Sequence, residues 1–531
     1  MSPEKVCKEK DYNYRVFHNK RARARARRIV YSRVYFNFLL IFIQIIVFIL
    51  FLLRLRTYIK YYFFASILLS FFFMVYLVNS PGKNEFKIAW MLPLIVFPLF
   101  GIGAYVSYHI NTGGRLTKKS LVAIIEKTKG MCHPSEDEQQ LLAQYPEIKG
   151  LCNYMINCGG FYPYSGCKVD YYPCGEVLFP EFLEELKKAK KMILIEFFII
   201  DFDESWQQVL NILIQKVNEG VKVYLLYDGL GSMMIATKAY TKYLNSKGIN
   251  ARIFLHLVPF FSSQLNNRDH RKIVVIDGTT AFTGGLNIKN EYFNYGKNRF
   301  AYWKDNFVKI QGEAVNAFTL MFLQNWNLNN KNEESYASYL IPNKKFQGEK
   351  GIVIPYGDDA YNHVDIAEDV YCYILNNAKT YVHITSPYLI VDNNVLFCLI
   401  NAVRRGVEVS IVLPSVSDHY LAFCIGRIFV KTLIDNGINI YFYEKGFIHA
   451  KTFVCDDEIA TVGSVNLDYR SFYHHFECGI IMYKVPAIAQ IEKDYQDILK
   501  DSLLITQEEY KKVPKIQRFW GRLLKIFAPL M

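Results

Sequence analysis

Two stretches of the chain carry the same polar residues in the same order. Residues 268–287 read RDHRKIVVIDGTTAFTGGLN, and residues 447–466 read FIHAKTFVCDDEIATVGSVN. Every member of the second set stands 179 positions after its counterpart in the first, so no insertion separates the members. This repeat indicates an internal duplication. The two sets are His270, Lys272, Asp277 and Asn287, and His449, Lys451, Asp456 and Asn466.

The residues around both copies predict an α/β fold. After each His the side chains alternate in a way that is typical of a buried or half-buried strand, on which His and Lys share one face. Apolar runs precede each copy, at 190–203 and 219–229 for the first and at 378–393 and 405–414 for the second. Because helix-like stretches of about 15 residues separate these runs, we expect βαβ units and a largely parallel sheet in each half.

The N-terminal part is predicted to be a membrane region. Residues 34–53, 61–78 and 88–108 are apolar runs about as long as a bilayer core requires. One such run could be a buried core helix, whereas three close together favour membrane spans. Residues 1–33 hold 11 Lys or Arg against three acids, which is typical of the cytoplasmic flank of a span and of contact with anionic lipid. A solvated or RNA-binding arm is the alternative, and the sequence leaves open which side of the membrane holds the remaining chain.

The doubled residues suit phosphoryl transfer. A single His beside a Lys is more often a structural pair, but two sets at one interface favour catalysis. One imidazole can attack phosphorus and form a phospho-histidine, while the other protonates the leaving alkoxide and deprotonates the incoming hydroxyl. Two lysines and two Asn amides would hold the equatorial oxygens as negative charge builds. Because this arrangement needs neither a metal nor a cofactor, we predict none.

The pattern HxKxxxxD followed by GGxN or GSxN, found twice, resembles the signature of the phospholipase D superfamily. Residues 89–105 (AWMLPLIVFPLFGIGAY) and 171–200 (YYPCGEVLFPEFLEELKKAKKMILIEFFII) resemble bacterial cardiolipin synthases, and the resemblance covers nearly the whole chain from residue 34. It implies a duplicated phospholipase D-type fold, in which two βαβ-rich halves are related by pseudo-twofold symmetry, preceded by transmembrane helices.

The resemblance also implies a role for individual residues. His270 would be the nucleophile and His449 the acid and base. Each His would be oriented by a downstream carboxylate, and the matching positions are Asp305 in YWKDN and Glu477 in HHFEC. The alternative for these two carboxylates is a surface ion pair.

Three further positions in the motifs have predicted roles. Asp277 and Asp456 belong to the signature, but each follows its Lys by five residues, an odd offset that faces away on a regular strand. We therefore predict that both have a structural role at a strand end. Ser464 stands where the first copy has Gly285, and we expect its hydroxyl to donate near the phosphate.

The C-terminal segment is predicted to be a basic amphipathic helix. Apolar residues recur at helical spacing on one side and basic residues on the other. Such a helix suits the headgroup region of an anionic membrane, whereas an ordinary helix packed on the core is the alternative. The apolar residues are Ile516, Phe519, Trp520, Leu523 and Phe527, and the basic ones are Lys515, Arg518, Arg522 and Lys525.

These observations together predict a multi-pass enzyme of the bacterial cell membrane. The expected reaction makes cardiolipin and glycerol from two phosphatidylglycerol molecules, with anionic membrane lipid as partner and no nucleic acid; the oligomeric state stays open. A phospholipase D, a phosphatidyltransferase with another acceptor, a nucleic-acid phosphodiesterase and an inactive membrane scaffold are the alternatives. The expected segments are a basic arm at 1–33, transmembrane helices within 34–110, a linker at 111–165, two phospholipase D-like halves at 166–345 and 346–510, and the amphipathic helix at 511–531.

Overall fold

The structure of the chain is a computed structural model. It describes residues 42–43, 46, 49–50, 59–109, 112–135, 138–255, 266–296, 298–328, 330, 333–361 and 364–530. The basic arm at 1–33 and nearly all of the first apolar run at 34–53 lie outside the described residues.

The first half is built on a seven-stranded sheet. Its strand order is β2-β9-β7-β6-β3-β4-β5, in which β3, β4 and β5 are parallel and the other neighbours are antiparallel. The prediction of a largely parallel sheet is therefore wrong for the motif strands, because the turn between β6 and β7 is too short for a crossover. The strands are β2 (Lys168–Tyr172), β3 (Met192–Phe197), β4 (Lys222–Asp228), β5 (Asn250–Phe254), β6 (Lys272–Ile276), β7 (Thr280–Gly284) and β9 (Phe307–Gln311).

The second half repeats this arrangement in a nine-stranded sheet. Its order is β1-β10-β19-β17-β16-β11-β13-β14-β20, with β11, β13 and β14 parallel and β16 and β17 forming the motif hairpin. β1 lies in the segment expected to be a linker, yet it pairs with β10. The strands are β1 (Tyr164–Ser165), β10 (Ile352–Asp358), β11 (Tyr381–Thr385), β13 (Glu408–Pro414), β14 (Asn439–Tyr443), β16 (Thr452–Cys455), β17 (Ile459–Gly463), β19 (Glu477–Tyr483) and β20 (Ser502–Leu504).

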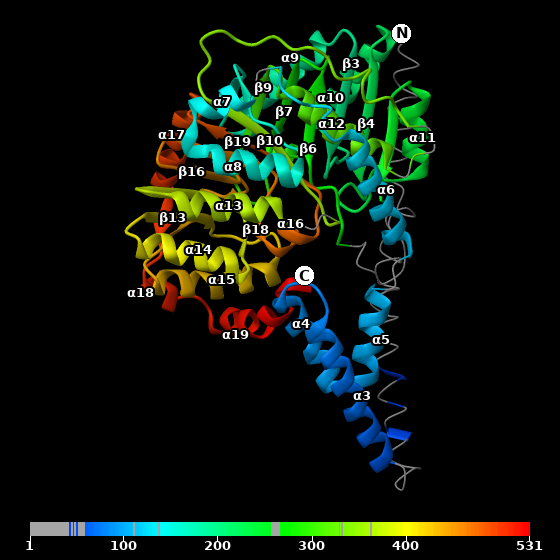
Figure 1. Cartoon of the computed structure of the whole chain (residues 1–531), viewed down its shortest axis with the longest axis vertical. Helices are drawn as coiled ribbons and strands as arrows, with labels where there is room; N and C mark the ends of the chain where they lie inside the picture. The colour runs from blue at the N-terminus through cyan, green and yellow to red at the C-terminus, as the bar shows by residue number, and fades with distance from the viewer. Residues whose placement is uncertain are drawn as a thin grey trace.

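Helices surround both sheets, and the two halves lie one above the other (Figure 1). One apolar cluster contains residues of β6 and β9 together with residues of β16, β17 and β19, so the motif strands of both halves share a core. The helices are α9 (Gly175–Lys188), α10 (Glu204–Asn218), α11 (Lys238–Ser246) and α12 (Val315–Asn327) in the first half, and α13 (Ile366–Asn377), α14 (Asn393–Arg404), α15 (Tyr420–Asp435), α16 (Tyr469–Tyr473) and α17 (Ala487–Lys500) in the second.

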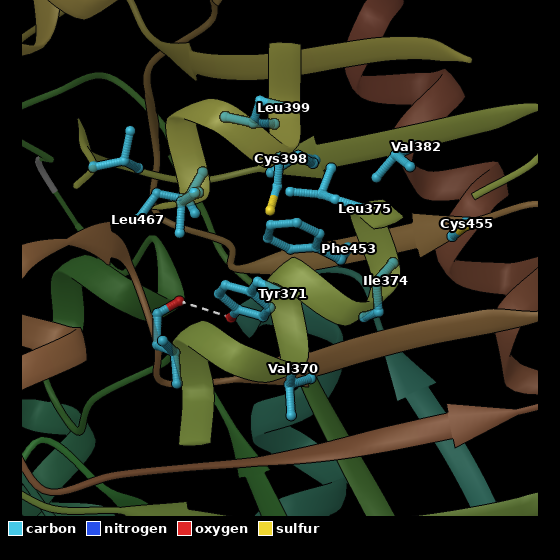
Figure 2. Packing of buried hydrophobic residues seen from close by; sticks show 14 of the residues in the cluster. Val370, Tyr371, Ile374, Leu375, Val382, Cys398, Leu399, Phe453, Cys455 and Leu467 are labelled. Atoms are coloured by element: carbon cyan, nitrogen blue, oxygen red, sulfur yellow. Dashed lines mark hydrogen bonds between the residues drawn. The ribbon is translucent and has the colours of Figure 1, made fainter. Parts of the chain in front are cut away.

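A second apolar cluster fixes the backbone beside the second motif. Figure 2 shows the Tyr371 ring of α13 lying against Phe453 of β16, and their ring centroids are 4.1 Å apart. The Tyr371 hydroxyl donates to the carbonyl oxygen of Val465 at 3.2 Å. Because Val465 directly precedes Asn466, this packing holds the end of the motif in place.

Helices α3 (Ile59–Asn79), α4 (Asn84–Val96) and α5 (Pro98–His109) extend away from the two halves, whereas α7 (Glu138–Gln144) and α8 (Lys149–Tyr154) share an apolar cluster with α13 of the second half (Figure 1). Among the residues that the structure describes, no helix is both long and apolar enough to cross a membrane. The run predicted at 88–108 is divided at Phe97, because Pro98 disfavours helical backbone at the residue before it. The N-terminal helices also include α6 (Thr112–Thr128).

The C-terminal segment forms α18 (Gln507–Lys511), α19 (Lys515–Leu524) and a 3-10 turn at Lys525–Leu530. α19 packs on α15 through Gly521, where a Cβ would lie 2.2 Å from the carbonyl oxygen of Cys424. The absence of a side chain at Gly521 therefore allows α19 to approach α15 this closely.

Candidate active site

A short parallel pairing brings His449 to a carboxylate of the first half. β15 (Phe447–Ile448) directly precedes His449, and it pairs with β8 (Trp303–Lys304), which directly precedes Asp305. The backbone N–H of His449 donates to the carbonyl oxygen of Lys304 at 2.7 Å. As a result, Nδ1 of His449 lies 2.6 Å from Oδ2 of Asp305, and both side chains are buried.

A second parallel backbone pairing brings His270 to a carboxylate of the second half. Asp269 and Phe476 form an isolated parallel bridge, and each directly precedes one member of the pair. The backbone N–H of His270 donates to the carbonyl oxygen of Phe476 at 2.8 Å. Nδ1 of His270 lies 3.0 Å from both carboxylate oxygens of Glu477, which is fully buried.

The two pairs are therefore crossed between the halves. The carboxylate that follows the first motif orients the His of the second, and the reverse holds for the other pair. A carboxylate that accepts from Nδ1–H fixes the tautomer and leaves Nε2 unprotonated. Each motif His is therefore oriented by a carboxylate of the other half.

Both imidazoles are neutral near neutral pH. Burial lowers the pKa of His270 to about 3 and that of His449 to about 4, and the neighbouring carboxylates only partly oppose this shift. Burial alone would raise the pKa of Glu477, but His270 beside it holds that pKa well below its usual range. Nε2 of each ring thus keeps a lone pair for attack or for accepting a proton.

Two buried lysines stand next to the imidazoles. Lys272 donates to the carbonyl oxygen of His270 at 2.5 Å, and Lys451 donates to the carbonyl oxygen of His449. Burial lowers the pKa of Lys272 to about 8 and that of Lys451 to about 7. A buried cation with a lowered pKa gains stability from an anion, so this place suits a phosphate.

The two motif asparagines are buried but differ in their bonds. Oδ1 of Asn287 accepts from the backbone N–H of Ile199 at 3.0 Å. Oδ1 of Asn466 has no hydrogen-bond partner among the described residues. The two amides are therefore not equivalent.

Two hydroxyl groups hold the Glu477 carboxylate. Ser471 donates to Oε1 at 2.8 Å, and Ser464 donates to Oε2. The prediction that Ser464 donates near the phosphate is wrong, because its proton is directed to the carboxylate. Ser471 was missed, since nothing in its sequence context marks it as a partner of Glu477.

Asp277 and Asp456 lie at the far ends of the motif strands from the histidines. The Asp277 carboxylate accepts from the backbone N–H groups of residues 190–192 at 2.6 to 3.0 Å. Asp456 accepts from residues 379–381 at 2.8 Å. Each carboxylate therefore satisfies the backbone where a central strand begins, and neither lies at the imidazoles.

A third buried histidine lies beside the first motif. The His475 ring centroid is 5.2 Å from that of His270, and its Nδ1 is 3.5 Å from Oε1 of Glu477. At the matching place in the other half, the Trp303 ring lies 5.2 Å from that of His449. Sequence reasoning missed His475, and its only signal was its position two residues before Glu477.

Comparison with known proteins gives close relatives. The family described as "Cardiolipin synthase, PLD-like domain" matches residues 182–326 and 371–499. A protein of Streptococcus mutans described as uncharacterized is 40% identical over 462 residues, covering 86% of this chain and 99% of that protein. A cardiolipin synthase of Geobacillus kaustophilus is 32% identical over 471 residues, covering 87% of this chain and 92% of that enzyme.

A solved structure shares the fold. Phosphatidylserine synthase of Haemophilus influenzae matches with a TM-score of 0.55 and 18% identity, covering 72% of this chain and 98% of that one. This likeness agrees with the α/β architecture described above. The family match and the Geobacillus relative show that the chain belongs to the cardiolipin synthase family of phospholipase D-like proteins.

Proposed function

We propose that this chain is a phosphatidyltransferase that makes cardiolipin and glycerol from two phosphatidylglycerol molecules. The observation that carries the proposal is the crossed pair of buried imidazoles, His270 with Glu477 and His449 with Asp305. Such a pair offers a nucleophile and a separate acid, which a two-step transfer through a covalent intermediate requires.

In the first step, Nε2 of His270 attacks the phosphorus of one lipid. The N–P bond forms, the P–O bond to the glycerol headgroup breaks, and protonated His449 gives its proton to the departing oxygen. Burial lowers the pKa of His449, and the negative charge of the bound phosphodiester raises it again. Lys272 and Lys451 neutralise the charge on the equatorial oxygens.

In the second step, a headgroup hydroxyl of the other lipid attacks the phospho-histidine. Neutral His449 takes the hydroxyl proton, the new O–P bond forms and the N–P bond breaks. Cardiolipin leaves and His270 returns to its neutral form, while His449 releases its proton with the product and takes one up again when the next phosphodiester binds. The bonds and protons balance over one cycle, so the proposed steps need no metal or cofactor.

We also propose that the N-terminal region and α19 seat the enzyme on a membrane. Large apolar side chains of α3 are exposed, such as Phe64 and Phe72 at 70% and 61%. In α19, Phe519 and Ile516 are exposed at 58% and 55%. Side chains of this kind on a surface favour contact with lipid. The spans expected at 34–53 and 61–78, and a multi-pass arrangement, remain part of this proposal.

The test uses phosphatidylglycerol labelled in its headgroup and acyl chains, presented in vesicles to the full-length protein. We expect cardiolipin and free glycerol in equal amounts, with the same rate after thorough chelation of divalent cations. Phosphatidic acid as the main product would instead identify a phospholipase D. Transfer to another alcohol, or cleavage of nucleic acid without lipid turnover, would assign the corresponding alternative.

A further inference from the structure

Beside His270 and Glu477 lies His475, a buried histidine that has no role in the proposed transfer reaction. His475 is only 7% exposed, and neither of its ring nitrogens has a hydrogen-bond partner among the described residues. A buried imidazole that makes no hydrogen bond and has only a 3.5 Å contact to Glu477 is costly unless something binds it. One nitrogen each of His270 and His475 and one oxygen of Glu477 lie within 4.8 Å of one another.

The distances within this set fit a small tetrahedral cation. Nδ1 of His270 and Nδ1 of His475 lie 3.0 Å and 3.5 Å from Oε1 of Glu477. For bonds of about 2.0 to 2.2 Å at tetrahedral angles, neighbouring ligand atoms are about 3.3 Å apart. Small movements of the side chains would therefore suffice.

We propose that His270, His475 and Glu477 form a binding site for a divalent transition metal, with Zn²⁺ as the best match, and that the bound metal inhibits the enzyme. Two imidazoles and one carboxylate are a donor set that Zn²⁺, Co²⁺ and Cu²⁺ prefer, whereas Mg²⁺ and Ca²⁺ prefer oxygen ligands alone. A water molecule would be the fourth ligand.

Inhibition follows from which nitrogen the metal takes. In the free site Nδ1 of His270 carries the proton and donates it to Glu477, so Nε2 is free to attack. A metal on Nδ1 transfers that proton to Nε2 of the same ring, and no proton leaves the imidazole. The nucleophilic nitrogen then has no lone pair, and attack on phosphorus stops.

The other half of the molecule supplies an internal contrast. Beside His449 the matching position is Trp303, whose indole nitrogen is not a metal ligand. The set around His270 is the one group of three such ligands that the described part of the chain contains. We therefore expect one metal per chain.

Binding can be measured without any lipid. Co²⁺ is added to the chelator-treated full-length protein, and the visible absorption of tetrahedral Co²⁺ is recorded. We expect one equivalent to bind in the wild type, and the band to disappear in His475→Asn. The matched control is His474→Gln, since Nε2 of His474 already lies 3.2 Å from the carbonyl oxygen of Pro529. The control should keep the band, and circular dichroism checks that both variants are folded.

Inhibition is measured separately, and this part rests on the proposed function. Zn²⁺ should lower kcat at saturating phosphatidylglycerol, and His475→Asn should raise the half-inhibitory Zn²⁺ concentration at least tenfold. A band that persists in folded His475→Asn, no band in the wild type, or inhibition that lipid overcomes would overturn the proposal. A Co²⁺ band in a protein that makes no cardiolipin would instead leave the metal site standing and reject the proposed function.

Discussion

The two motif histidines lie in equivalent positions of the two halves, but the carboxylates that orient them have different neighbours. Glu477, which orients His270, accepts from the hydroxyls of Ser464 and Ser471. Asp305, which orients His449, stands against Gly285, where a Cβ would lie 2.0 Å from its Oδ1. Gly285 is the counterpart of Ser464, so the shorter carboxylate takes space that the serine side chain fills in the other half.

The two halves thus share the contact between His and carboxylate but differ in the groups that contact the carboxylate. The distance from Nδ1 to a carboxylate is short in both pairs, so both rings are oriented in the same way. The groups that support each carboxylate diverged, which allows one imidazole to act as nucleophile and the other as acid and base. The comparison can therefore be tested by treating the two halves as separate steps of one reaction.

Removing either imidazole should give the largest effects, and the two should differ in kind. We expect His270→Ala to abolish turnover by at least about 10⁴-fold and to leave no labelled phosphatidyl-enzyme. His449→Ala should also be nearly inactive but should accumulate a slowly resolving adduct, because the nucleophile is intact. Acid-quench trapping with labelled lipid measures both. Normal adduct formation in His270→Ala would reverse the two roles.

The crossed carboxylates should reproduce these two phenotypes more weakly. Glu477→Gln should behave like loss of His270, with adduct formation slowed by about 10³-fold, because the ring loses its preferred tautomer. Asp305→Asn should instead form adduct and resolve it slowly, like loss of His449. The same quench experiment applies. If Glu477→Gln instead behaved like loss of His449, and Asp305→Asn like loss of His270, the crossed contacts would not orient the catalytic imidazoles.

The two lysines should set the fall of activity at alkaline pH. Burial lowers the pKa of Lys451 to about 7 and that of Lys272 to about 8. Both are cations below these values and lose their protons as the pH rises. We therefore expect kcat/KM to fall with rising pH, by about tenfold per unit once one lysine is neutral. Lys451→Arg, which stays charged, should move the fall to the higher value, and an unchanged profile in that variant would exclude Lys451 as the group responsible.

Much of this architecture could be predicted from the sequence, because the repeat and the apolar periodicity are local signals. The motif strands and the helices between them follow from such signals, whereas the positions of both carboxylates were implied by the resemblance to the family. The crossed pairing could not be predicted, since its partners are 207 and 144 positions apart and their contact depends on how the halves pack. The contact of His270 with His475 and Glu477, on which the proposed metal site is built, depends on the same packing of the two halves.

Errors in the sequence-based fold have physical causes as well. A strand pattern does not distinguish a hairpin from a crossover, so the antiparallel motif strands were missed. The apolar run at 88–108 contains Pro93 and Pro98, and the second of these ends α4 at Val96. Hydropathy alone does not register that break.

The smallest expected effect concerns the exposed apolar side of α19, the helix that packs on α15 of the second half. α19 packs on α15 and leaves Phe519 and Trp520 exposed at 58% and 39%. If these rings enter the headgroup region, replacing both with Ser should lower activity on bilayers about fivefold and leave activity on short-chain soluble lipid nearly unchanged. Added salt should reproduce part of the loss by screening the basic residues of α19. Val177→Ser, which removes a 55% exposed side chain from α9 in the first half, is the matched control. Equal losses on both substrates, together with a lower Tm, would show that the two rings stabilise the fold instead of binding lipid.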